Sequence, residues 1–208
     1  MEFMEAIRNR RTCRVFEEKE IPNKILSEII EAGYLAPTND HLRKWEIITI
    51  RDMDKKKALL LEINKDRNRD VAVEIVNKSD MKDEDQKNMY IEAIPLQYKM
   101  LMYSGALILP FYYQNKNYNE FVSLSDFNYF ASIWCVIENM LIAASGYGIM
   151  GVTRIPTEEE RKKVKEIIGS PEKYEFPCYL SLGYPKYNET KIKQILINIE
   201  DHIHNDKW

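Results

Sequence analysis

Cysteine and glycine are scarce in this sequence. Its 208 residues include 7 glycines and 3 cysteines, and Cys13, Cys135 and Cys178 are far apart and never in CxxC spacing. This pattern indicates neither a structural zinc site nor a redox dithiol. His202 and His204 are poor metal ligands because residues two apart point away from each other on a helix. We therefore expect no metal site and three reduced thiols, as in a cytoplasmic protein.

Long apolar runs and a strong net charge are also missing. The longest apolar stretch, residues 106–113, is too short to cross a bilayer. The N-terminal residues 1–5 are acidic and lack the apolar core of a signal peptide. The formal net charge of -3 gives no general attraction to nucleic acid or anionic lipid. We therefore expect a cytoplasmic protein that binds neither nucleic acid nor membrane.

No repeat, low-complexity tract or Gly/Ser linker divides the chain. Hydrophobic residues make up 45% of it, which is enough for a core without disulfide bonds. We predict one domain over residues 1–208. Within it, residues 65–100 form a variable excursion, much of it highly charged, and residues 186–208 form a tail with no obvious packing surface in its own subunit.

Hydrophobic periodicity predicts helices and strands in irregular alternation. The expected helices span residues 2–9, 22–33, 53–64, 125–144 and 157–169, and the expected strands span residues 45–50, 106–113 and 177–183. Thr157 and Glu160 match a capping box, Gly169 can end that helix, and Pro110 favours an edge or bulge position in its strand. This order indicates an α+β fold in which helices sandwich a mixed sheet.

The segment Gly146-Tyr147-Gly148-Ile149-Met150-Gly151 matches GxGxxG, the dinucleotide-binding fingerprint. That motif requires a strand before it and a helix after it, so that the pyrophosphate meets a helix N-terminus. Here a long predicted helix comes first and extended residues follow. We therefore reject a Rossmann site and expect Gly146 and Gly148 to end the helix with left-handed backbone.

Three segments carry polar groups that could form a ligand site. Arg10-Arg11-Thr12-Cys13-Arg14 places guanidinium groups and a hydroxyl in one short stretch. Such groups can hold a phosphate through paired hydrogen bonds, although most basic stretches are solvated surface. Residues 35–45 form a polar turn between a helix and a strand, and residues 146–154 leave the longest helix. As bare patterns, these last two segments are only loops.

In order and spacing, these segments and the last strand resemble the nitroreductase family. The family has an RRSxR-like element, then APSxxNxQPW, a GLG-like turn after a long central helix, and a final strand that ends in GYP. The corresponding segments here are RRTCR (10–14), APTNDHLRKW (36–45), SGYGIMGVTR (145–154) and LSLGYP (180–185). The chain departs from the family at His41, where Asn is usual, and at Arg43 and Lys44, where Gln-Pro is usual.

The resemblance implies a mainly antiparallel sheet and a homodimer with FMN at the interface. One chain would supply Arg10 and Thr12 to the phosphate and ribityl chain, and Arg14 to the N1/O2 edge of the flavin. Arg11 would lie alongside, backbone near Thr153 and Arg154 would approach the flavin, and Lys191 or Lys193 would complete the phosphate site. The second subunit would contribute Pro37, Thr38 and Asn39, with His41 beside them. The C-terminal extension would wrap the partner subunit. The broad apolar face predicted for residues 127–141 also favours a subunit contact.

The function implied by the resemblance is that of an FMN-dependent oxidoreductase. Hydride would pass from NAD(P)H through FMN to a small organic acceptor such as a nitroaromatic or a quinone, and Arg14 would support negative charge on the flavin. A non-catalytic flavin-binding or sensing dimer is one alternative. Reductive dehalogenation or flavin destruction on the same fold is another. A structural dimer without flavin is a third.

Overall fold

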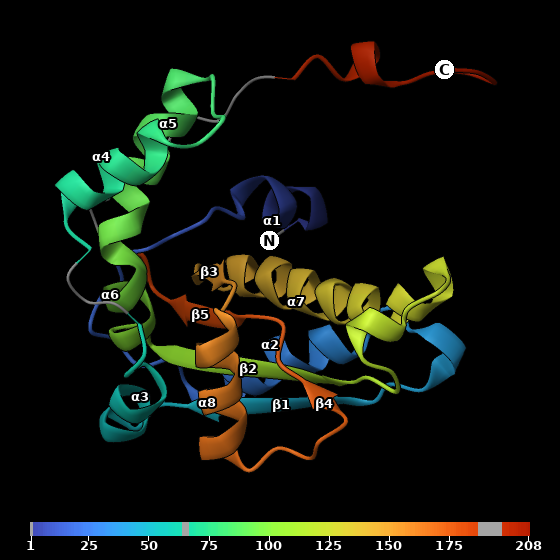
Figure 1. Ribbon diagram of the computed structural model, residues 1–208, viewed down its shortest axis with the longest axis horizontal. Helices are drawn as coiled ribbons and strands as arrows, with labels where there is room; N and C mark the ends of the chain where they lie inside the picture. The colour runs from blue at the N-terminus through green and yellow to red at the C-terminus, as the bar shows by residue number, and fades with distance from the viewer. Residues whose placement is uncertain (1, 64–66, 187–196) are drawn as a thin grey trace.

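A five-stranded sheet with helices on both faces forms the body of the computed structural model, which describes residues 2–63, 67–186 and 197–208 (Figure 1). The elements are α1 (Phe3–Asn9), α2 (Asn23–Tyr34), β1 (Trp45–Ile50), α3 (Met53–Leu59), α4 (Arg69–Asn77), α5 (Glu84–Ala93), α6 (Gln97–Met102), β2 (Ala106–Tyr113), α7 (Asn128–Gly146), β3 (Met150–Arg154), α8 (Glu158–Ile168), β4 (Tyr174–Glu175) and β5 (Tyr179–Gly183). The helices and strands predicted from periodicity are all present, although the helix expected over residues 53–64 ends at Leu59.

The strands follow the order β1-β2-β5-β3, and β4 pairs with β2 beside this path. All of these pairings are antiparallel. One isolated parallel bridge joins Thr12 to Gly151. The predicted α+β fold with a mixed, mainly antiparallel sheet between helices is therefore confirmed.

Pro110 does not lie at an edge or bulge, so that expectation was wrong. It pairs with Ile47 of β1, and its strand lies inside the sheet. On the other side of β2, pairing with β5 ends at Ile108 and pairing with β4 begins at Tyr112. Pro110 lies in this gap, where its missing N–H removes no ladder hydrogen bond.

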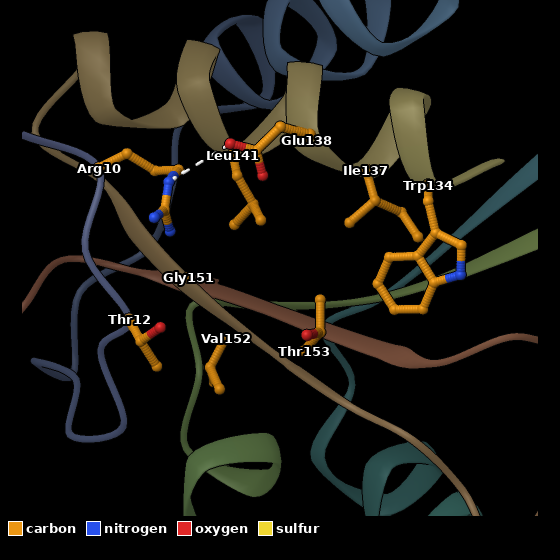
Figure 2. A pocket seen from close by; sticks show the side chains of 9 residues that line it. All are labelled: Arg10, Thr12, Trp134, Ile137, Glu138, Leu141, Gly151, Val152 and Thr153. Atoms are coloured by element: carbon orange, nitrogen blue, oxygen red, sulfur yellow. Dashed lines mark ion pairs between the residues drawn. The ribbon is translucent and has the colours of Figure 1, made fainter. Parts of the chain in front are cut away.

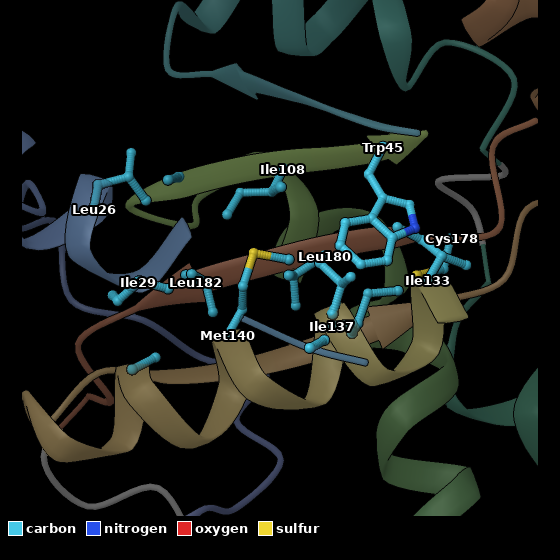
Figure 3. Packing of buried hydrophobic residues seen from close by; sticks show 14 of the residues in the cluster. Leu26, Ile29, Trp45, Ile108, Ile133, Ile137, Met140, Cys178, Leu180 and Leu182 are labelled. Atoms are coloured by element: carbon cyan, nitrogen blue, oxygen red, sulfur yellow. The ribbon is translucent and has the colours of Figure 1, made fainter. Parts of the chain in front are cut away.

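Each face of the sheet has its own hydrophobic core, because side chains alternate between faces along a strand. The core shared with α2 and α7 includes Leu26, Ile29, Ile108, Ile133, Val136, Met140, Leu180 and Leu182 (Figure 3). The core on the other face includes Leu59, Leu101, Leu107, Leu109, Phe111, Val152, Val164 and Tyr179. The sheet is therefore covered by α2 and α7 on one face and by α3, α6 and α8 on the other.

α7, with the short turn before it, is the one described stretch long and apolar enough to cross a membrane. In this fold it packs against α1, α2, β2 and β3. A Cβ added at Gly33 of α2 would lie 2.8 Å from Met140 Cγ and 3.1 Å from Val136 Cγ1. The two helices therefore meet at a position where glycine gives the needed room, and the buried side of α7 belongs to the core on this face of the sheet.

The apolar face predicted for α7 is covered only in part within the chain. Ile137 is buried, and the Phe130 ring lies edge-on to Tyr112 with 6.0 Å between ring centroids. Phe127, just before the helix, remains 47% exposed. Phe130, Trp134 and Leu141 are only half-buried, so the sheet and α2 account for part of this face and the predicted subunit contact stays a prediction.

The ends of α7 and α8 show how glycines terminate helices in this chain. Thr157 and Glu160 form the predicted capping box, and Gly169 ends α8 with left-handed backbone at φ 69°. Gly148 has the same conformation at φ 71°, whereas Gly146 is the last residue of α7 and lacks a positive φ. The prediction that both glycines adopt left-handed backbone was therefore right for Gly148 and wrong for Gly146. Because a helix precedes the glycines and β3 follows them, the structure agrees with the rejection of a Rossmann site.

The charged segment after residue 66 contains two helices, α4 and α5, which the sequence did not predict. Asn68 and Asp83 cap them, since their side chains accept hydrogen bonds from Val71 and Gln86 backbone N–H groups at 3.0 and 2.7 Å. The pair has a small apolar cluster of its own and projects from the body in Figure 1. These N-caps were the local signal that the charge pattern obscured.

Lys56 of α3 is buried, with 2% of its surface exposed. Its ammonium group donates to the carbonyl oxygens of Met102, the last residue of α6, and of Ser104 at 3.3 and 2.6 Å. Burial, and secondarily the nearby Arg51 charge, lowers the pKa of Lys56 to about 8. The group thus ties α3 to the C-terminal end of α6 while carrying a charge that burial disfavours.

We expect Lys56 to make stability rise with pH between about 8 and 10.5. In this window the unfolded chain still binds the proton that folded Lys56 has lost, so the free energy of unfolding rises by on the order of 3 kcal/mol. Urea unfolding across this pH range should show a smaller rise for Lys56→Met than for the wild type. The exposed neighbour Lys57 provides the control variant Lys57→Met. Equal rises in the wild type and Lys56→Met would contradict the prediction.

Candidate functional site

The arginine-rich segment runs beside the start of β3. Thr12 bridges Gly151 in parallel, and the Cys13 N–H donates to the Gly151 carbonyl at 3.1 Å. Further along, the N–H of Glu17 donates to the Tyr184 carbonyl at 2.9 Å. The segments 10–14, 145–154 and 180–185 therefore lie side by side, although more than 130 residues separate the first from the other two along the chain.

A cavity of about 220 Å³ lies between this segment, β3 and α7 (Figure 2). Its lining residues are Arg10, Thr12, Trp134, Ile137, Glu138, Leu141, Gly151, Val152 and Thr153. Arg10, Thr12 and Glu138 lie toward one side, and the Trp134 indole lies toward Thr153 on the other (Figure 2). The cavity therefore suits a ligand with an anionic end and an aromatic end.

Arg10 follows directly on α1 and forms an ion pair with Glu138 of α7. Its Nε lies 3.4 Å from Glu138 Oε1. In Figure 2, the two terminal nitrogens of Arg10 point away from Glu138, toward the side where Thr12 lies. The main chain here is held as well, because the Ser145 hydroxyl donates to the Ala6 carbonyl of α1 at 2.6 Å.

Thr153 and Arg154 are adjacent on β3 but face different surroundings. Thr153 lines the cavity. Arg154 instead forms a two-point ion pair with Glu160, in which Nη2 lies 2.8 Å from Oε1 and Nη1 contacts Oε2. Arg154 Nε also donates to Gln97 Oε1 at 3.3 Å. Only the backbone of Arg154 remains available for the role that the resemblance implies.

Gly151 allows the strand to pass close to α7 and β5. A Cβ at this position would lie 2.6 Å from Leu141 Cδ2, 2.7 Å from Leu182 Cδ2 and 2.9 Å from the Ser181 carbonyl oxygen. No side chain can be added there without moving these neighbours. The last glycine of the GxGxxG match is thus required for packing at the cavity wall.

The segment with Pro37, Thr38, Asn39 and His41 lies elsewhere along α7. The Asn39 N–H donates to Ser132 Oγ at 3.3 Å, and Asn128 Nδ2 donates to Asn39 Oδ1 at 3.1 Å. Ser132 and Glu138 are six residues apart, which places them roughly 9 Å apart along the helix axis and roughly 120° apart around it. The loop therefore does not line the cavity of its own chain.

This loop also contains backbone that is unusual for residues with side chains. His41 and Arg43 have positive φ angles of 54° and 43°. Left-handed backbone costs a non-glycine residue roughly 1–2 kcal/mol, and such strain is often found at functional sites. Both residues lie at positions where the sequence departs from the family pattern.

The remaining predicted site residues do not line the cavity. Arg11 and Arg14 are half-buried in the arginine-rich segment, and Lys191 and Lys193 lie outside the described residues. Cys13 is buried, and its thiol donates to the Val15 carbonyl at 3.2 Å, which fits a packed thiol better than a redox-active one. None of the three cysteines, all of which are described, forms a disulfide.

Sequence reasoning missed the contribution of α7 to this site. Trp134, Ile137, Glu138 and Leu141 recur at steps of three and four, so they share one helical face. The apolar members of this set were interpreted as core or subunit contact. The acidic residue within the stripe was the signal that this face meets a polar partner.

A second cavity, of about 560 Å³, lies near the loop after β2. It contains none of the residues predicted from the motifs. Much of its charge is paired internally, since Arg161 contacts both Glu158 and Glu175. Within the described residues, no group of three or more His, Cys, Asp or Glu side chains could hold a metal ion.

A family model described as the nitroreductase family matches residues 7–184. A protein of Archaeoglobus fulgidus, provisionally named an NADH dehydrogenase/NAD(P)H nitroreductase, is 23% identical over 209 residues, which cover 100% of this chain and 99% of that protein. Among solved structures, a nitroreductase with bound FMN from Bacteroides fragilis has a TM-score of 0.64 at 22% identity and covers 95% of this chain and 96% of its own. An iodotyrosine deiodinase bound to FMN and 3-iodo-L-tyrosine has a TM-score of 0.70 at 16% identity, with 100% of both chains covered.

Proposed function

The chain belongs to the nitroreductase family, and from that premise we propose that it is an FMN-dependent oxidoreductase that acts as a homodimer in the cytoplasm. One observation carries the proposal: the bridge between Thr12 and Gly151 brings two distant segments of the family pattern to one cavity. Bound FMN would supply the hydride chemistry between NAD(P)H and a small acceptor such as a nitroaromatic or quinone.

The cavity fits the chemistry of FMN at both ends. Arg10 and Thr12 offer a guanidinium group and a hydroxyl, which suit a phosphate and a ribityl chain. Trp134, Ile137 and Leu141 offer an aromatic and aliphatic wall, which suits a flat ring system. The described part of the chain has no Rossmann unit to hold the adenine half of FAD.

The residues beside the cavity would position the ring and stabilise its charge. Arg14, two residues beyond Thr12, would lie at the N1/O2 edge, where a fixed cation favours negative charge. The backbone of Thr153 would border N5, and the Arg154–Glu160 pair holds this end of β3 against α8. Lys191 or Lys193 would complete the phosphate site, with Arg11 alongside.

The partner subunit would complete the site. Pro37, Thr38 and Asn39, with His41 beside them, lie too far around α7 to line the cavity of their own chain. Residues 197–208 are all exposed, including apolar side chains such as Ile199 at 63% and Trp208 at 102%. In a homodimer, the loop of residues 37–41 in each chain would reach the cavity of the other chain. The C-terminal tail of each chain would wrap the other subunit.

The purified protein should be yellow, release FMN on denaturation and lose its visible absorbance when NADH or NADPH is added without oxygen. Chromatography of the released flavin and anaerobic spectra are the measurements. A colourless protein that takes up no added FMN would overturn the proposal, as would recovery of FAD alone. A yellow protein that neither NADH nor NADPH bleaches would indicate a flavin-binding or sensing role instead.

Reductive dehalogenation is a second candidate, and the similarity to iodotyrosine deiodinases favours it. A relative of this name from Nematostella vectensis is 24% identical over 191 residues, which cover 88% of this chain. Incubation of the reduced protein with 3-iodo-L-tyrosine separates the two functions. Release of iodide at a rate above that of nitroaromatic or quinone reduction would favour dehalogenation.

A further inference from the structure

Glu138 contacts Arg10 in a way that leaves the donor fork of the guanidinium available. The ion pair joins Glu138 to Nε, on one edge of the group. The two terminal nitrogens point into the cavity, away from the carboxylate (Figure 2). A phosphate is bound best by such paired N–H donors. The ion pair with Glu138 thus uses the Nε edge of the Arg10 guanidinium and leaves the two terminal nitrogens for a phosphate.

The main chain before Arg10 is already held, so its side chain is the part left to orient. The Arg10 N–H donates to the Ala6 carbonyl at 3.0 Å, and that carbonyl also accepts from Ser145 of α7. A long arginine side chain otherwise loses rotamer freedom when it binds a ligand. An ion pair formed beforehand removes part of that loss before the ligand arrives.

We propose that Glu138 is a positioning residue for the phosphate of the bound flavin. It holds Arg10 by Nε and turns the terminal nitrogens toward the phosphate. This inference rests on the proposed function, because it assumes that the phosphorylated end of FMN lies at Arg10. Glu138 also carries negative charge, but its side chain is 52% exposed, so water screens its repulsion of the phosphate.

The test compares FMN with riboflavin, which lacks the phosphate, on protein freed of flavin. Flavin fluorescence titration should show that Glu138→Ala weakens FMN binding about 5–10-fold, because Arg10 is no longer oriented. Riboflavin binding should change less than about twofold. Glu138→Gln keeps an oxygen that can accept from Nε, so it should recover most of the lost FMN affinity.

Two controls separate positioning from a general effect of charge. Glu92→Ala removes an exposed, ion-paired carboxylate from α5 and changes the net charge equally, so its FMN affinity should match the wild type. In an Arg10→Ala background, Glu138→Ala should have no further effect on the ratio of FMN to riboflavin affinity. Unchanged or tighter FMN binding by Glu138→Ala would overturn the inference alone. A wild type that binds neither flavin would overturn the proposed function.

Discussion

Replacing Glu160 by glutamine should lower the free energy of unfolding by about 3–5 kcal/mol, because it leaves the buried Arg154 charge without its carboxylate partner. The side chains of Arg154 and Glu160 are only 8% and 4% exposed, so water cannot substitute for the lost charge. Glutamine preserves the shape of the residue and can still serve in the capping box with Thr157. The substitution therefore isolates the charge, and urea unfolding measures its effect.

The matched control removes the cation as well. In Arg154→Met/Glu160→Gln no uncompensated charge remains at this position, so at least half of the lost stability should return. Glu158→Gln, at an exposed position of the same helix turn, should change stability by less than about 1 kcal/mol. A Glu160→Gln protein within about 1 kcal/mol of the wild type would show that this pair contributes little to holding the end of β3.

A mixed dimer isolated after co-expression of two defective chains should hold about half of the wild-type amount of flavin if the site is shared between subunits. Arg10→Glu would disable the phosphate end, because a carboxylate repels the anion. Thr38→Trp would block the loop that we assign to the opposite site. Each homodimer carries one lesion at both sites and should bind little FMN. A mixed dimer carries both lesions at one site and keeps the other site intact.

Different affinity tags on the two chains allow the mixed dimer to be isolated, and its flavin content is then read from the visible spectrum. Size-exclusion chromatography of each homodimer shows whether the variants still fold and associate. If each site lay within a single chain, both chains of the mixed dimer would carry a lesion in their own site. A stable mixed dimer without flavin would therefore contradict the shared site.

Several features were predictable from the sequence because they depend on neighbours along the chain. The capping box of Thr157 and Glu160 and the left-handed Gly169 are set within a single helix. The order of helix, glycines and strand around residues 146–154 follows from local periodicity, and it sufficed to reject a Rossmann site. The antiparallel sheet between helices followed from the resemblance, which four segments in the correct order support.

Other features depended on which elements pack together. Pro110 lies in an internal strand because the partner of β2 changes there from β5 to β4. Glu160 was predicted as a capping residue, but its pairing with Arg154 arises where α8 begins against the end of β3. Lys56 is buried because α3 packs close to the end of α6.

The same distinction between local sequence and tertiary packing applies to the candidate site. The sequence by itself determined that Arg10 and Thr12 lie in one short basic stretch, because these residues are close neighbours along the chain. Only the tertiary structure placed this stretch against β3 and brought Trp134 and Glu138 of α7 to the same cavity. The reason is physical: contacts between residues more than 120 positions apart depend on how the helices and sheet pack, and no local propensity encodes that packing.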